Sequence, residues 1–150
     1  MSPDSIPLRL PGFLRQINAQ PLTLAEPAAR MAFVIDLARR NAAADGGPFA
    51  AAVFERESGR LVAAGANRVL ASRSSLAHAE MVALALAQQS LATHDLGAPE
   101  LPAHELVSSV EPCLMCLGGV LWSGVQALIC GARDEDARAV GFDEGPKPGE

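Results

Sequence analysis

The 150-residue sequence contains no tyrosine, and phenylalanine and tryptophan together make up only 4% of it. It has no apolar run that approaches the roughly 18 residues of a membrane span. Its N-terminal segment places Asp4 before the first arginine and is broken by prolines, unlike a signal peptide. Glycine and proline follow no short period, which excludes collagen-like and low-complexity chains. We therefore expect a cytoplasmic protein with no membrane partner.

Basic residues are also scarce. The net charge is −5, and the longest basic run is Arg39-Arg40, so the chain lacks the basic footprint of a nucleic-acid-binding protein. We expect a small neutral substrate and no nucleic acid. Because 49% of the residues are hydrophobic and 19% charged, we expect one globular domain over 1–150. Residues 1–25 would form an N-terminal extension and 141–150 a C-terminal tail.

Periodicity and breaker residues predict helices alternating with strands after an opening hairpin. Apolar residues in 10–17 indicate a short amphipathic helical turn, and a longer helix starts with Pro27 and stops before the glycines at 46–47. This pattern predicts an α/β fold, a three-layer α/β/α sandwich whose mixed central sheet has an antiparallel hairpin followed by parallel strands. The expected strands are 49–55, 61–66, 105–110 and 126–132, and the later helices are 78–89, 113–123 and 134–140.

The three cysteines are an odd number, and two of them form the pair Cys113 and Cys116. In a chain without an export signal, this spacing indicates metal or redox chemistry before disulfides. The two thiols lie at i and i+3 on one helix face, near a helix N-terminus that favours thiolates. His78 opens another helix and supplies a third ligand. Three His or Cys ligands with an open fourth position are typical of a catalytic zinc.

Glu80 lies two residues after His78, on another side of the helix, where it would carry protons beside the metal. Each half of the pattern alone has an ordinary structural interpretation, as a helix start or as core cysteines. Together, H-x-E and P-C-x-x-C are the signature of zinc-dependent deaminases. A structural zinc would need a fourth ligand. We expect Cys130 in the core and His94 and His104 on the surface, so none of them supplies it.

At these residues the sequence resembles the cytidine deaminase-like superfamily, and within it the bacterial guanine deaminases, from about residue 44 to 125. The resemblance implies one Zn²⁺ per chain, held by the three ligands above, and a homodimer. It rests on the segments DGGPF (45–49), GANR (65–68), AHAEM (77–81), EPCLMCLG (111–118) and LWS (121–123).

The resemblance also implies a substrate pocket. Phe49 would lie over the purine, Asn67 would bind the ring edge, and Ala79 and Trp122 would line the pocket. Each has an alternative interpretation: Phe49 as a strand-core aromatic, Asn67 as a turn residue, and Trp122 as a core or dimer-interface residue.

The C-terminal tail departs from the pattern. Guanine deaminases of this type use a second carboxylate from a later segment of the chain. Glu144 would supply it here, with Asp143 as the other candidate. The alternative interpretation of these two residues is a solvated acidic turn. Family members continue through another helix, whereas this chain ends at Glu150 and has no tyrosine for an aromatic cap. We therefore expect a shortened form.

The expected reaction is hydrolytic deamination of guanine to xanthine and ammonia, with Glu80 and Glu144 as catalytic residues. Other amino-substituted rings such as an aminotriazine or cytosine are alternatives, because a few hydrogen bonds set specificity in such pockets. A tRNA adenosine deaminase and a catalytically silent homologue are further alternatives. The acidic charge and Trp122 count against the first, and the presence of Glu80 counts against the second.

Overall fold

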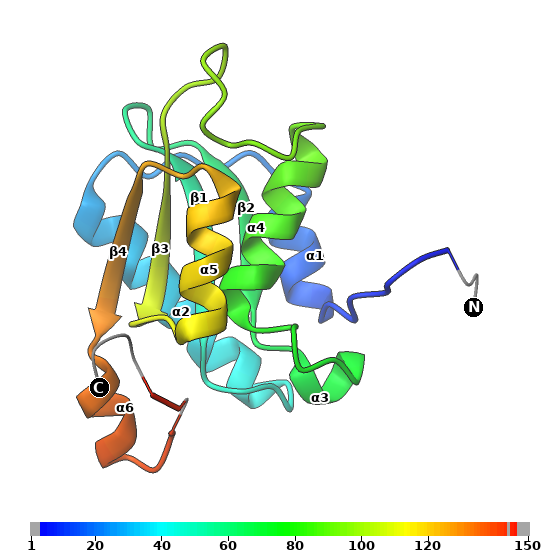
Figure 1. The fold of residues 1–150 in the computed structure, drawn as a ribbon, viewed down its shortest axis with the longest axis vertical. Coiled ribbons are helices and arrows are strands. Elements are labelled where there is room, and N and C mark those ends of the chain that lie inside the picture. The colour runs from blue at the N-terminus through cyan, green and yellow to red at the C-terminus, as the bar shows by residue number, and fades with distance from the viewer. Residues whose placement is uncertain (1–3, 144, 147–150) are drawn as a thin grey trace.

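A mixed sheet of four strands, in the order β2-β1-β3-β4, lies at the centre of the molecule (Figure 1). The computed structural model describes residues 4–143 and 145–146. β1 runs antiparallel to β2 and β3, whereas β3 and β4 are parallel, which confirms the predicted hairpin followed by parallel strands. The strands are β1 (Ala50–Glu55), β2 (Leu61–Ala66), β3 (His104–Val110) and β4 (Ala127–Ala132).

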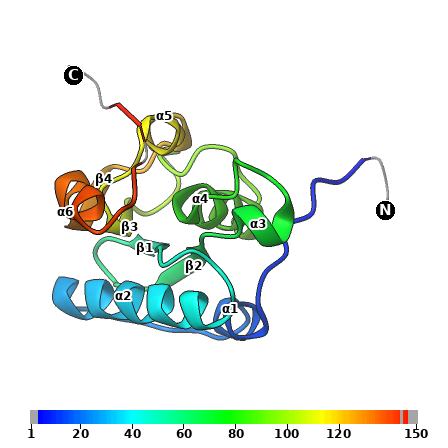
Figure 2. The ribbon, with the colours of Figure 1, turned by 90° about the horizontal axis from the view of Figure 1, so that it is seen from below.

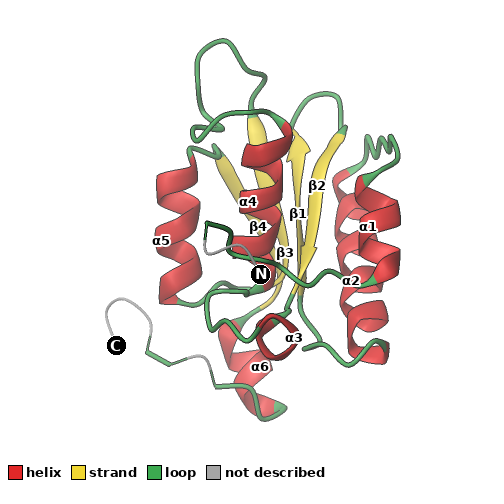
Figure 3. Cartoon of the chain, turned by 90° about the vertical axis from the view of Figure 1, so that its right-hand side faces the viewer, coloured by secondary structure: helices red, strands yellow, loops and turns green. Residues whose placement is uncertain are grey.

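Helices cover both faces of the sheet, which confirms the three predicted layers. Figure 2 and Figure 3 show α1 and α2 against one face and α4 and α5 against the other. The short helices α3 and α6 lie at the end of the sheet where β2, β3 and β4 finish. Within the described residues, no helix has the length and apolar character needed to cross a membrane. The helices are α1 (Gly12–Asn18), α2 (Pro27–Ala43), α3 (Val69–Ser72), α4 (Ala79–Ser90), α5 (Leu114–Ser123) and α6 (Asp134–Ala139).

The alternation of side chains along β1 divides the core in two. Phe54 packs with α1 and α2, whereas Val53 packs against α4 and α5. Every residue of 50–54 is buried, because the strand is covered on both faces. Three consecutive alanines at 50–52 leave room for helices on both sides.

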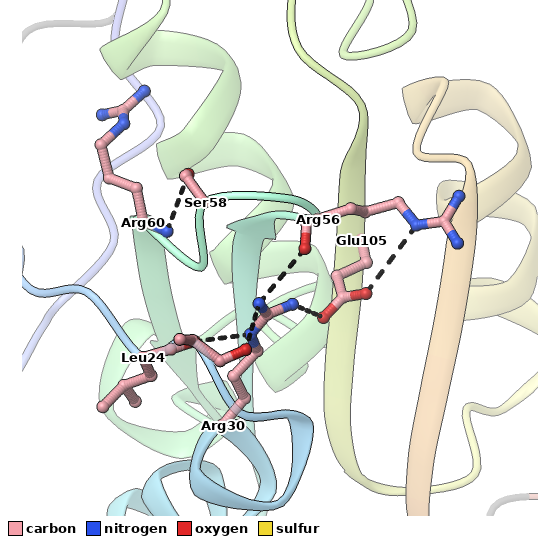
Figure 4. A network of polar contacts seen from close by, with 7 residues as sticks. Leu24, Arg30, Arg56, Ser58, Arg60 and Glu105 are labelled. Atoms are coloured by element: carbon pink, nitrogen blue, oxygen red, sulfur yellow. Dashed lines mark hydrogen bonds and ion pairs between the residues drawn. The ribbon is translucent and has the colours of Figure 1, made fainter.

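A buried ion pair joins α2 to β3 at the end of the sheet away from α6. Arg30 Nη1 lies 2.7 Å from Glu105 Oε1, and both side chains are almost fully buried. The other guanidinium nitrogens donate to the carbonyls of Leu24 and Arg56 (Figure 4). One of them also donates to the carbonyl of Ala25. Hydrogen bonds therefore satisfy the buried cation, as an ion pair removed from water requires.

Four local expectations need correction. α3 is absent from the predicted pattern. His78 and Cys113 are the N-caps of α4 and α5 rather than their first helical residues. His104 is fully buried, because the connection before β3 folds over it and Leu96 O accepts a hydrogen bond from its Nδ1 at 2.8 Å. Cys130 is exposed, because β4 is an edge strand.

Gly65 is a point where α4 approaches the sheet closely. A Cβ built on Gly65 would lie 2.4 Å from Ala83 N and 2.5 Å from Ala79 O. Both contacts are with backbone atoms, which no side-chain rotation can relieve. A glycine in β2 therefore sets the depth at which the first turn of α4, with Glu80, sits on the sheet.

We expect Gly65→Ala to lower the free energy of unfolding by about 1–3 kcal/mol, because the added methyl group overpacks a rigid contact. Gly118→Ala in α5 is the matched control, since a Cβ there meets nothing within 4 Å. That variant should gain about 0.5–1 kcal/mol from helix propensity. Urea unfolding measures both, and equal stabilities for the two variants would contradict the close approach.

Candidate active site

Two helices, α4 and α5, begin side by side at the end of the sheet where β3 finishes (Figure 1). His78 is the N-cap of α4 and Cys113 is the N-cap of α5, with Cys116 one turn further on. One ligand atom from each of the three residues lies within 4.8 Å of the others. The distance from His78 Nδ1 to Cys113 Sγ is 3.7 Å. The structure thus brings together the three residues predicted to hold a metal.

Local sequence helps to explain why α5 starts here, and both helices begin with the same backbone geometry. Pro112 precedes Cys113 and disfavours helical backbone before the cap. The cap carbonyls of His78 and Cys113 accept the first helical hydrogen bonds, at 3.0 and 2.9 Å. The positive ends of two helix dipoles therefore face the ligand atoms and favour negatively charged sulfur.

The surroundings of Cys116 oppose its ionisation. Burial, followed by the nearby Glu80 carboxylate and Cys113, raises the pKa of the Cys116 thiol far above its usual range. A divalent cation at the ligand atoms would reverse this effect by stabilising the thiolates. One imidazole and two thiolates suit Zn²⁺ and leave a fourth position for water or substrate.

Glu80 lies beside the ligand cluster, not within it. Its side chain is buried, with Oε2 3.4 Å from Cys116 Sγ and Oε1 3.3 Å from Ser108 Oγ. The Ser108 hydroxyl also contacts Val110 O at 2.7 Å. Because a hydroxyl has one proton, the shorter contact favours donation to Val110 O. Glu80 is therefore a buried carboxylate next to the metal ligands with capacity to accept protons.

A cleft opens from Glu80 between β1, β2 and the end of β3. Phe49 and Asn67, each at the site end of its strand, form two of its walls, and Asn67 N–H donates to Phe49 O at 3.0 Å. The sequence analysis missed Ser108 and Ser109, because serines inside a strand carry no motif. The cleft is lined by Phe49, Asn67, His78, Ala79, Glu80, Ser108, Ser109 and Val110.

The segment after α6 forms the outer rim of this cleft. The Phe142 ring meets the Phe49 ring edge to face, with centroids 5.0 Å apart. Asp143 lines the same outer hollow, which also includes Asn67 and His78. Glu144, predicted as a catalytic residue, lies outside the described residues. Of the two carboxylates predicted for this segment, the structure therefore places Asp143 at the mouth of the cleft.

Hydrogen bonds fasten this C-terminal segment to the metal-binding loop. Asp134 N–H, at the start of α6, donates to Glu111 Oε2 at 3.0 Å, and Glu111 is two residues from Cys113. Arg138 Nη2 donates to Gly145 O at 3.0 Å. The rim of the cleft is thus tied to the same loop that carries the first thiol ligand.

Trp122 does not reach the cleft. It lies in the last turn of α5 and is 89% exposed, and it is absent from the lining of both hollows around His78. Six residues, or about 1.7 turns of helix, separate it from Cys116, which is about 9 Å along the axis. The pocket-lining role expected for Trp122 therefore has no support within this chain.

Asn41 and Arg68 form a buried polar pair behind the cleft, which the sequence analysis did not single out. Arg68 Nη1 donates to Asn41 Oδ1 at 2.9 Å. A signal was available: Asn41 follows Val34 and Leu37 by seven and four residues, so it occupies the apolar face of α2.

The chain resembles known deaminases in sequence and structure. Residues 26–132 match the family described as the cytidine and deoxycytidylate deaminase zinc-binding region. The guanine deaminase of Bacillus subtilis strain 168 is 38% identical over 99 residues, which make up 66% of this chain and 59% of that protein. The chain thus spans about six tenths of the length of this relative.

Solved structures agree over almost the whole chain. The guanine deaminase of Nitrosomonas europaea is 59% identical, with a TM-score of 0.96 over 99% of this chain and 81% of the other. The protein NE0047, in complex with 2,6-diaminopurine, is 61% identical, with a TM-score of 0.94 over 97% and 77%. Because the family match covers most of the chain and includes all three metal ligands, the protein belongs to the cytidine and deoxycytidylate deaminase family and carries its zinc-binding region.

Proposed function

We propose that the protein catalyses the zinc-dependent hydrolysis of guanine to xanthine and ammonia. The observation that carries the proposal is the buried Glu80 carboxylate beside His78, Cys113 and Cys116, at the base of a cleft walled by Phe49 and Asn67. The Bacillus subtilis and Nitrosomonas europaea relatives are guanine deaminases, which supports the same substrate here.

When bound, zinc supplies the positive charge that makes a water acidic enough to lose a proton near neutral pH. Glu80 accepts that proton as the water oxygen bonds to C2 of guanine. It then delivers the proton to the ring nitrogen, and a second proton transfer lets the amino group leave as ammonia. Water and guanine are thereby converted to xanthine and ammonia with no other reactant.

Recognition falls to residues around the cleft. The Phe49 ring offers a face for a planar base. The Asn67 amide can both donate and accept hydrogen bonds along the ring edge, and Ala79, almost fully buried, leaves room above the first turn of α4. We assign the second carboxylate to Glu144, with Asp143 at the rim as the other candidate. The complex of NE0047 with 2,6-diaminopurine, an aminopurine, supports a purine in this position.

Other aminated rings would use the same chemistry, so cytosine and an aminotriazine remain alternative substrates. A tRNA adenosine deaminase fits less well, because a net charge of −5 opposes the binding of a polynucleotide. We propose one deaminase unit per chain. We also place the enzyme in the cytoplasm. Cys113 Sγ lies 3.7 Å from His78 Nδ1 and Cys116 Sγ lies 3.4 Å from Glu80 Oε2, and these thiols can serve as metal ligands only when they are reduced.

We further propose a homodimer formed through α5 and β4. Leu121 and Trp122 project from α5 at 82% and 89% exposure. Among the described residues β4 pairs only with β3, and its side chains are half-buried or exposed. Trp is enriched at the centres of protein interfaces, which gives Trp122 the interface role rather than the pocket role.

The metal assignment predicts unequal effects of two cysteine substitutions. Cys116→Ser should lose most of its zinc, because a hydroxyl is a far poorer zinc ligand than a thiolate. Cys130→Ser, at an exposed position in β4, should keep one zinc per chain. Elemental analysis of the purified proteins measures both, and a Cys116→Ser protein with full zinc would contradict the ligand set.

The reaction is tested by ammonia release from guanine, adenine, cytosine, cytidine, guanosine and an aminotriazine. We expect release from guanine, and a loss of about 10²- to 10⁴-fold in Glu80→Gln, which keeps the shape of the side chain but removes the proton acceptor. Zinc content should not change. Glu57→Gln, exposed in the β1–β2 turn, is the control. Turnover by Glu80→Gln at the wild-type rate would refute the assigned role.

The dimer is tested by analytical ultracentrifugation. We expect a dimer at micromolar concentration, shifted towards monomer by Trp122→Arg, because burying an unpaired charge is costly. Monomer alone across the micromolar range in the unsubstituted protein would reject the interface.

A further inference from the structure

Asn41 lies near the end of α2, in the helix layer on the far side of the sheet from α4 and α5, and its side chain is fully buried. Its Nδ2 donates to Gly47 O at 2.8 Å and to Asn67 O at 2.9 Å. Its Oδ1 accepts a bond from Arg68 Nη1. Both N–H groups and the oxygen of this amide are therefore engaged, and all by two loops that reach the cleft.

The two loops carry the two walls of the cleft. Gly47 O accepts a second bond from Phe49 N–H at 2.8 Å, and Asn67 N–H donates to Phe49 O at 3.0 Å. The Asn41 amide is thus hydrogen-bonded to the turn that precedes Phe49 and to the backbone of Asn67 itself. Asn41 therefore links the backbones of both walls, in addition to the direct bond between Asn67 N–H and Phe49 O.

The surrounding backbone is shaped to admit the amide. A Cβ built on Gly46 would lie 2.2 Å from Asn41 Nδ2. Gly46 N–H also donates to Asn41 O at 2.8 Å, so the loop wraps around the residue. Without the amide, the half-buried carbonyls of Gly47 and Asn67 would each lose a hydrogen-bond donor.

We propose that Asn41 is a positioning residue for substrate recognition, holding Phe49 and Asn67 at the spacing that a planar purine requires. This inference rests on the proposed function. Asn41 contacts neither the metal ligands nor Glu80, so it acts on the binding of the base and not on the proton transfers. Loss of the correct spacing would weaken binding of the base equally in the ground state and the transition state, which raises KM and leaves kcat nearly unchanged.

The first test is Asn41→Asp, which keeps the shape but replaces two donors with acceptors that face the carbonyls. We expect KM for guanine to rise about tenfold or more, with zinc content unchanged and kcat within about threefold of the wild type. Asn18→Asp is the matched control, because Asn18 Nδ2 also donates to a backbone carbonyl, Ala64 O at 2.9 Å, but within β2. It should lower stability and leave KM unchanged.

A second variant tests the proposal independently if Asn41→Asp fails to fold. Gly46→Ala leaves Asn41 in place but pushes its amide away, and it should raise KM in the same direction. If Asn41→Asp and Gly46→Ala fold and leave KM unchanged, or if they lower kcat through loss of zinc, the proposal is overturned.

Hydrogen exchange separates this proposal from the proposed function. In Asn41→Asp the amides of Asn67 and Phe49 should exchange faster while those of β1 and β3 stay protected, a local effect that general destabilisation would not produce. If the wild-type protein releases no ammonia from guanine, the proposed function fails, and the exchange of these two amides still decides the positioning role. Unchanged exchange at both would reject it.

Discussion

Two thiols and a carboxylate lie buried in contact at the start of α4 and α5, and these three acidic groups cannot all ionise together without a positive charge among them. Glu80 and Cys113 each help to raise the pKa of the Cys116 thiol. A divalent cation removes the conflict, since it converts mutual repulsion into ligation. The Glu80 carboxylate and the three candidate metal ligands are therefore coupled electrostatically.

The rest of the fold serves to bring the two helix starts together. Small residues on β1 and β2 allow helices to approach the sheet closely, as at Gly65, where the backbone of α4 meets the strand. At the opposite end of the sheet the buried Arg30–Glu105 pair joins α2 to β3. The starts of two helices thus carry Glu80 and the candidate metal ligands. Functional groups are held most accurately on rigid elements of this kind.

The residues proposed to recognise the substrate lie elsewhere. Phe49, Asn67 and Phe142 line the outer hollow from strand ends and from the segment after α6, and Asn41 in the opposite helix layer donates a hydrogen bond to Asn67 O. Loops of this kind can change without disturbing a scaffold. The chain itself matches the cytidine and deoxycytidylate deaminase zinc-binding region and has a guanine deaminase among its relatives, and all three candidate metal ligands lie within the matched residues.

The sequence alone determined the metal ligands, Glu80 and the order of helices and strands, because helix periodicity and ligand spacing act over a few residues. Only the tertiary structure decided how segments distant in the chain meet. It buried His104 under the connection before β3, exposed Cys130 on an edge strand and left Trp122 facing away from the cleft. It also brought Asn41 from α2 to the loops at Gly47 and Asn67. The physical reason is that burial and hydrogen-bond partners depend on which elements pack together, and no local pattern contains that information.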